Sequence, residues 1–284
     1  MKEIARRAKN LIFSISVASD SSDVQSKDSF HLDFEDKTYR QNDLCDLIRD
    51  TVIFFALTED ERDSLNQETF ALLQKRAWNR ISDRQLQQKG DYGELLLFLI
   101  LEVFYPARKF VTKVRLRTSR KDEIKGYDCA HFAIEDDEVS LWLGEAKFHK
   151  SFSTGIFEAI RSIKDHLKIN SIKQELSILE GNVEILGEER EILEGYLQSG
   201  ISVDKMNFKI PILITYDSKS VANHNSICDE FLQELNEELT KKYSSIENRE
   251  IEIPSNVILK FILLPLETVE EIKKRLFEIE KAHK

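Results

Sequence analysis

Two apolar stretches joined by a short acidic segment constrain the fold of this 284-residue chain more than any other feature. The first stretch, Asp128–Ile134, and the second, Val139–Lys147, have the length and apolar content of β-strands. The residues between them are all acidic, which favours an exposed turn. We therefore expect an antiparallel hairpin in which the start of the first strand lies beside the end of the second.

The open end of this hairpin carries two carboxylates and a lysine. Because successive side chains of a strand point to opposite faces, Glu145 and Lys147 share a face near Asp128, while Ala146 points into the core. Neighbouring carboxylates repel each other unless a hard cation lies between them, and Mg²⁺ is usually held by one or two carboxylates with phosphate oxygens and water. A lysine beside them can stabilise charge on phosphorus. The pattern predicts a metal-dependent nuclease site.

Other interpretations of these residues stay open. Glu145 and Lys147 can form a purely structural ion pair at a strand end. Cys129 and His131 share a strand face and offer a thiol nucleophile, although a buried cysteine is the more common state. His149 follows Lys147 on the same face and is expected either at the surface or beside a metal or phosphate. The absence of a Gly-x-x-x-x-Gly-Lys-Ser/Thr motif argues against ATP hydrolysis by this chain.

The elements around the hairpin follow a recognisable order. A helix is expected at Asp91–Phe104 and a basic strand at Phe110–Thr118, both before the hairpin. A helix at Thr154–Lys168 and a strand at Ile210–Tyr216 follow it. This αβββαβ order resembles the core of the PD-(D/E)XK phosphodiesterase superfamily. The resemblance implies a restriction-endonuclease-like α/β fold with a mixed central sheet flanked by helices.

The same resemblance implies roles for four side chains. Glu94, on the first helix, would join Asp128 and Glu145 as a metal ligand, and Lys147 would assist the attacking water. The alternative for Glu94 is an acid in the first turn that interacts favourably with the helix dipole. Tyr127 stands where the superfamily motif has proline, a position at which many members differ.

Four segments are also similar to the HamA family, the effector subunits of the Hachiman antiphage defence system. These segments are GELLLFLILE at 93–102, TSR at 118–120, KGYDCAH at 125–131 and LWLGEAK at 141–147. The resemblance implies a DNA nuclease that uses Mg²⁺, with Mn²⁺ as a substitute, in the bacterial cytoplasm. It also implies control by a superfamily 2 helicase partner, a HamB-like subunit. The alternatives are a non-catalytic subunit that binds and regulates a helicase, and an RNA nuclease with the same site residues.

The charge distribution bears on nucleic-acid binding. A formal net charge of −10 argues against strong non-specific binding of DNA by the free chain. Basic residues nevertheless gather just before the hairpin; the candidates for nucleic-acid contact are Lys113, Arg115, Arg117, Arg120, Lys121 and Lys125. The first three alternate with Val114 and Leu116, so they are expected to line one strand face beside the site. A solvated edge strand protected against aggregation is the alternative interpretation.

The remaining sequence predicts supporting elements. Residues 1–84 are expected to form an N-terminal α+β element for support or partner contact, with strands at Leu11–Val17 and Phe30–Phe34, and residues 85–284 to form the nuclease domain. The polar run Ala18–Lys27 is expected to be a loop. The helix at Thr154–Lys168 is expected to bury one face, made of Ile156, Phe157, Ile160, Ile163 and Leu167. Its outer face would carry Arg161, Lys164 and Lys168, which could contact phosphates or simply be solvated.

Cysteine content and hydropathy indicate the cellular compartment in which the protein is expected. Cys45, Cys129 and Cys228 are widely spaced, so the sequence indicates neither a disulfide framework nor a zinc site, and a reducing cytosol is expected. No stretch of the sequence approaches the roughly 18 apolar residues of a membrane-spanning helix.

Overall fold

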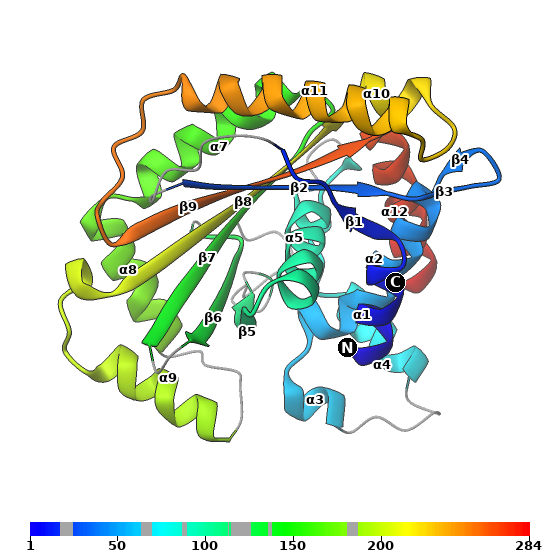
Figure 1. Ribbon diagram of the computed structural model, residues 1–284. Coiled ribbons are helices and arrows are strands. Elements are labelled where there is room, and N and C mark those ends of the chain that lie inside the picture. The colour runs from blue at the N-terminus through cyan, green and yellow to red at the C-terminus, as the bar shows by residue number, and fades with distance from the viewer. Residues whose placement is uncertain are drawn as a thin grey trace.

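A mixed β-sheet runs through the centre of the computed structural model (Figure 1). The structure describes residues 1–17, 25–63, 70–86, 90–112, 114, 126–135, 138–180 and 187–284. Within these residues seven strands form one sheet in the order β1-β2-β9-β8-β7-β6-β5. The expected α/β fold with a mixed central sheet flanked by helices is therefore confirmed.

One half of the sheet is antiparallel and contains the predicted hairpin. Its strands are β5 (Arg108–Thr112), β6 (Cys129–Glu135) and β7 (Glu138–Phe148). Glu135 and Glu138 are paired at the closed end of the hairpin. β5 pairs with the outer side of β6 in antiparallel fashion.

The other half of the sheet is mostly parallel. β8 (Asn207–Asp217) and β9 (Val257–Leu266) run parallel to β7 and to each other. Both are nearly continuous apolar runs, as expected for parallel strands that are covered on both faces. The connection between them contains α10 (Lys219–Asn223) and α11 (Asp229–Glu247).

The N-terminal residues complete the same sheet. β2 (Gln25–Leu32) lies parallel beside β9, and β1 (Ile12–Ser14) pairs with β2 at the edge. A separate short hairpin joins β3 (Phe34–Glu35) to β4 (Thr38–Tyr39). The expected division after residue 84 stays a prediction about folding units, but the strands on its two sides share one sheet.

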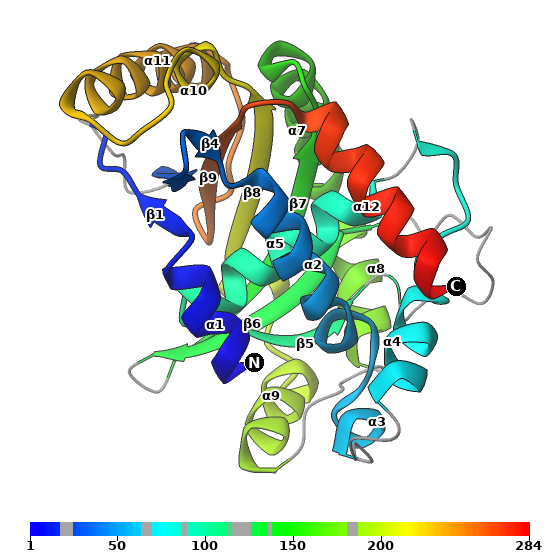
Figure 2. The ribbon, with the colours of Figure 1, turned by 90° about the vertical axis from the view of Figure 1, so that its right-hand side faces the viewer.

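Helices cover the sheet on two faces (Figures 1 and 2). A Cβ at Gly93 of α5 (Asp91–Phe104) would lie 3.0 Å from the Phe148 Cβ, whereas one at Gly155 of α7 (Phe152–His166) would lie 3.8 Å from the Lys147 Cβ. Because consecutive residues of β7 point to opposite faces, α5 and α7 pack on opposite sides of this strand. Both helices approach β7 closely because a glycine faces it.

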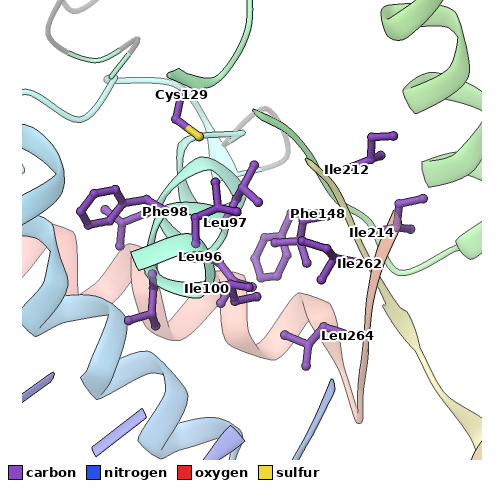
Figure 3. Packing of buried hydrophobic residues seen from close by; sticks show 14 of the residues in the cluster. Leu96, Leu97, Phe98, Ile100, Cys129, Phe148, Ile212, Ile214, Ile262 and Leu264 are labelled. Atoms are coloured by element: carbon purple, nitrogen blue, oxygen red, sulfur yellow. The ribbon is translucent and has the colours of Figure 1, made fainter. Parts of the chain in front are cut away.

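The helix α5 is apolar around almost its whole circumference, which is typical of a helix buried in the core. Figure 3 shows Leu96, Leu97 and Ile100 of this helix beside Phe148 of β7. Cys129, at the start of β6, belongs to the same buried cluster. The open end of the hairpin is therefore built directly on the hydrophobic core.

The remaining helices pack around this core. They are α1 (Lys2–Lys9), α2 (Gln41–Ala56), α3 (Glu59–Asp63), α4 (Phe70–Trp78), α8 (Ile169–Glu180), α9 (Glu188–Gln198) and α12 (Val269–His283), with a 3₁₀ turn at Val203–Lys205. The Tyr92 hydroxyl donates a 2.6 Å hydrogen bond to Glu280, which ties α12 to the start of α5. Among the described helices, none has both the length and the apolar content needed to cross a membrane.

From α5 to β8 the chain contains the expected αβββαβ elements, with α8, α9 and the 3₁₀ turn inserted between α7 and β8. Some local expectations are wrong. Residues 25–27 belong to β2 rather than to a loop, β1 ends at Ser14, and β5 ends at Thr112 with Val114 in helical conformation. Phe157 is 59% exposed rather than buried, while the other expected inner residues of α7 are buried.

We expect Gly144→Ala to destabilise the fold. The added Cβ would lie 2.7 Å from the Cys129 sulfur and 2.8 Å from the Leu97 Cδ2, so at least one of these buried side chains or its backbone would have to shift. Overpacking of this kind typically costs about 1–3 kcal/mol, measurable by urea unfolding. Gly195→Ala in α9 is the matched control, because its Cβ would meet open space and should stabilise the helix by up to about 1 kcal/mol. Equal stability of Gly144→Ala and wild type would contradict the close packing.

Candidate functional site

The register of the hairpin brings Asp128 and Glu145 together. Cys129 pairs with Gly144, and the Asp128 amide donates a 2.8 Å hydrogen bond to the Gly144 carbonyl. Continuation of this register by one residue places Asp128 beside Glu145 on one face. Gly126, at φ 129°, occupies a backbone conformation that favours glycine, just before the chain enters β6.

Both carboxylates are buried and have protein partners. Asp128 and Glu145 are 8% and 3% exposed. The Asp128 Oδ2 accepts a 2.9 Å hydrogen bond from the Ala146 amide, and the Glu145 Oε1 accepts one of 2.5 Å from the Lys147 ammonium. The predicted proximity of the two acids and the lysine is therefore present in the fold, and their catalytic roles stay a proposal.

The environment of Glu145 opposes its ionisation. Burial and, to a smaller extent, the nearby charge of Asp128 raise the pKa of this carboxyl to about 7, against the lowering effects of Lys147 and of a hydrogen bond from Ser162. A cation between the two acids would reverse this balance, because it would stabilise both ionised forms. The donor set of two adjacent carboxylates fits a hard divalent cation completed by water and phosphate.

Glu94 lies in the first turn of α5 and is 6% exposed. It is close enough to the hairpin to act electrostatically, because burial and the charges of Asp128, Glu94 and Glu145 together raise the pKa of the Cys129 thiol. The described residues nevertheless contain no group of three acidic, histidine or cysteine side chains arranged to hold a metal ion. Participation of Glu94 as a third ligand would therefore require a change in side-chain conformation.

The thiol chemistry suggested by Cys129 and His131 is disfavoured. The Cys129 side chain is buried, and the raised pKa of its thiol opposes formation of the nucleophilic thiolate. Burial lowers the pKa of His131 to about 3, with a smaller contribution from Lys109, so this imidazole is neutral at ordinary pH. Both side chains therefore act as buried packing residues of the core.

The surroundings of the carboxylates include residues that the sequence did not indicate. The His166 Nε2, at the end of α7, lies 3.8 Å from the Glu145 Oε2, and the His166 ring stacks on Tyr127. Ser162, one turn earlier, hydrogen-bonds the Glu145 carboxylate. Residues 162 and 166 are four positions apart, which places them on one helix face, but this spacing alone does not reveal what that face contacts.

Other candidates from the sequence lie elsewhere. The Nε2 of His149 lies 3.1 Å from the Glu158 Oε2. Burial, with smaller effects of Lys273 and Lys147, lowers the pKa of His149. Arg161 and Lys164 are exposed on α7, and Lys168 is exposed just after the end of this helix. The basic residues expected to contact nucleic acid lie outside the described residues; they are Lys113, Arg115, Arg117, Arg120, Lys121 and Lys125.

The fold and this site define a class of protein: an α/β protein with an αβββαβ core that carries two buried acids and a lysine at the open end of its central hairpin. The model of the HamA family matches residues 9–279, so the chain belongs to the HamA family. Membership of this family makes the protein a component of Hachiman antiphage defence. A search of curated proteins finds no match.

We expect the stability of the metal-free protein to depend on the ionisation of Glu145. The pKa of this group is raised from 4.5 to about 7, so the folded state binds more protons than the unfolded state between these values. The contribution of Glu145 to the free energy of unfolding therefore falls as pH rises through this window, by up to roughly 3 kcal/mol.

Glu145→Gln removes this titration. In EDTA, the free energy of unfolding of the variant minus that of wild type should therefore increase from pH 4.5 to pH 7.5, as measured by urea titrations at several pH values. A difference that is independent of pH would show that Glu145 titrates normally in the folded protein.

Proposed function

We propose that this protein is a metal-dependent DNA nuclease, the effector of its defence system, which hydrolyses phosphodiester bonds. The observation that carries the proposal is the buried pair Asp128 and Glu145 with Lys147 bonded beside it, at the end of the central hairpin. Adjacent buried acids destabilise a fold unless they are neutralised. A bound metal ion would neutralise the two acids, which explains why they are buried side by side.

The chain supplies distinct groups for hydrolysis. Asp128 and Glu145, with Glu94 as an additional ligand, would hold Mg²⁺, for which Mn²⁺ can substitute. The bound cation would polarise the scissile phosphate and lower the pKa of a coordinated water. Lys147 would place a positive charge beside the phosphorus, where negative charge develops in the transition state.

Control by a partner is part of the proposal. Family membership implies a partner in the Hachiman system. We propose a superfamily 2 helicase, a HamB-like subunit, that restrains the nuclease until DNA is delivered. The formal net charge of −10 supports this view, because a strongly acidic chain binds free DNA weakly. The nuclease would then need a partner to bring DNA to its site.

The second candidate function is a non-catalytic subunit that binds and regulates the helicase. The net charge also favours this alternative, as does the lack, among the described residues, of three side chains already arranged for a metal. The burial of Asp128 beside Glu145 opposes it, because a site without a ligand has no reason to retain this electrostatic cost.

We expect Lys147→Met and Asp128→Asn to abolish cleavage. Purified protein, with and without the helicase and ATP, would be incubated with plasmid, linear duplex, single-stranded DNA and RNA in Mg²⁺, Mn²⁺ or EDTA. Wild type should cut DNA only with metal, and each variant should be at least about 100-fold slower, because an interaction with the transition state is lost.

Lys209→Met is the matched control for Lys147→Met. Lys209 also bonds a glutamate, Glu135, at 2.8 Å, but at the closed end of the hairpin, so its loss should leave cleavage unchanged. Cleavage that persists in both site variants would refute the nuclease site. Cutting of RNA in place of DNA would change the assigned substrate.

We expect Mn²⁺ to bind wild type and not Asp128→Ala, as measured by calorimetry. Metal binding at the two carboxylates should also raise the melting temperature more at pH 8 than at pH 5.5, because protonation of Glu145 competes with the cation. Identical binding isotherms for the two proteins would favour the non-catalytic subunit.

A further inference from the structure

The two oxygens of Glu145 have different neighbours. Oε1 accepts the hydrogen bond from Lys147, a residue of the same strand. Oε2 faces His166, whose Nε2 lies 3.8 Å away on α7. Glu145 is therefore held between a strand residue on one side and a helix residue on the other.

His166 is itself fixed by a buried aromatic ring. Its imidazole lies against Tyr127 with 4.3 Å between ring centroids and 26° between ring planes. Tyr127 is 6% exposed and directly precedes Asp128, so it belongs to the same end of the hairpin. The His166 side chain is only 15% exposed. The stack thus connects α7 to the segment that carries Asp128 and leads into β6.

We propose that His166 is a positioning residue of the nuclease site, which uses its contact with Tyr127 to fix the orientation of the Glu145 carboxylate toward the metal. This inference rests on the proposed nuclease function and extends the site from β6 and β7 to α7. Its basis is the placement of the imidazole between Tyr127 and Glu145.

The physical reason lies in the freedom of a carboxylate group. The terminal torsion of a glutamate is broad, so each additional contact narrows the range of carboxylate orientations, and His166 adds such a contact to the hydrogen bonds from Lys147 and Ser162. A distance of 3.8 Å exceeds that of a hydrogen bond but is close enough for the half-buried imidazole to restrict the position of the Glu145 Oε2. Side chains that orient metal ligands typically change metal affinity or activity by about 10–100-fold.

The test compares His166→Ala with His166→Gln. The alanine variant should weaken Mn²⁺ binding, measured by calorimetry, by about 10–100-fold and should lower kcat by a similar factor while the KM for DNA stays unchanged. Glutamine places an amide N–H near the position of Nε2, so this variant should recover part of both properties. Melting temperatures in EDTA would identify variants that fail to fold.

His224→Ala is the matched control. The Nδ1 of His224 also lies 3.8 Å from a glutamate oxygen, on Glu234, and its ring also packs on an aromatic residue, Phe231. His224 lies in the connection between β8 and β9, so its loss should alter neither metal affinity nor kcat.

The outcomes separate the inference from the function on which it rests. If wild type cuts DNA and binds Mn²⁺ while His166→Ala equals His224→Ala in both assays, the positioning role is wrong and the nuclease stands. If His166→Ala and His166→Gln lose stability in EDTA but keep metal affinity, the role of His166 is structural and the inference fails. If wild type neither cuts DNA nor binds Mn²⁺, the proposed function fails and the inference falls with it.

Discussion

The repulsion between two buried carboxylates is the constraint on which the arrangement of this site depends. Asp128 and Glu145 are brought together by strand pairing and have little access to water. At short distance in a poorly polarisable interior, like charges interact far more strongly than at a surface. The surrounding groups reduce this cost: the Ala146 amide, the Lys147 ammonium and Ser162 each contact one of the two acids.

The core makes this electrostatic arrangement rigid. Gly93 and Gly155 allow helices to approach β7 from its two faces, so the strand that carries Glu145 has little room to shift. Gly144 allows the same close approach to Cys129 and Leu97 at the open end of the hairpin. The acids therefore stand on tightly packed backbone rather than on loops, which favours a defined geometry for any ligand.

The hairpin and its charged end could be predicted because they depend on local patterns. Alternation along β7 determines which residues share a face, and the charged turn marks where the chain reverses. The burial of a helix residue is harder to predict when the residue lies at the margin of the apolar face. Phe157 follows the buried Ile156 by about 100° around the helix, so it lies at the edge of the apolar stripe and is exposed, with the Arg161 guanidinium 6.0 Å from its ring centroid.

The tertiary contacts of the site were not predictable in the same way. His166 lies at the opposite margin of the α7 stripe, where periodicity allows either solvent or a neighbour, and only the packing of α7 over β7 places it beside Glu145. The pairing of β2 with β9 is equally hidden from local pattern, because strand periodicity does not identify a partner more than 200 residues away.

This distant pairing has a consequence for the synthesis of the protein. The parallel neighbour of β2 becomes available only after the ribosome has made residues 257–266, so β2 must wait for a strand that lies more than 200 residues further along the chain. Contacts of such large sequence separation form late and slow the folding of a domain. Until then the sheet has an open edge at β8, and Tyr92, beside Glu94, has no Glu280 to bond. The central sheet, on which the proposed site stands, is therefore complete only after β9 has been synthesised.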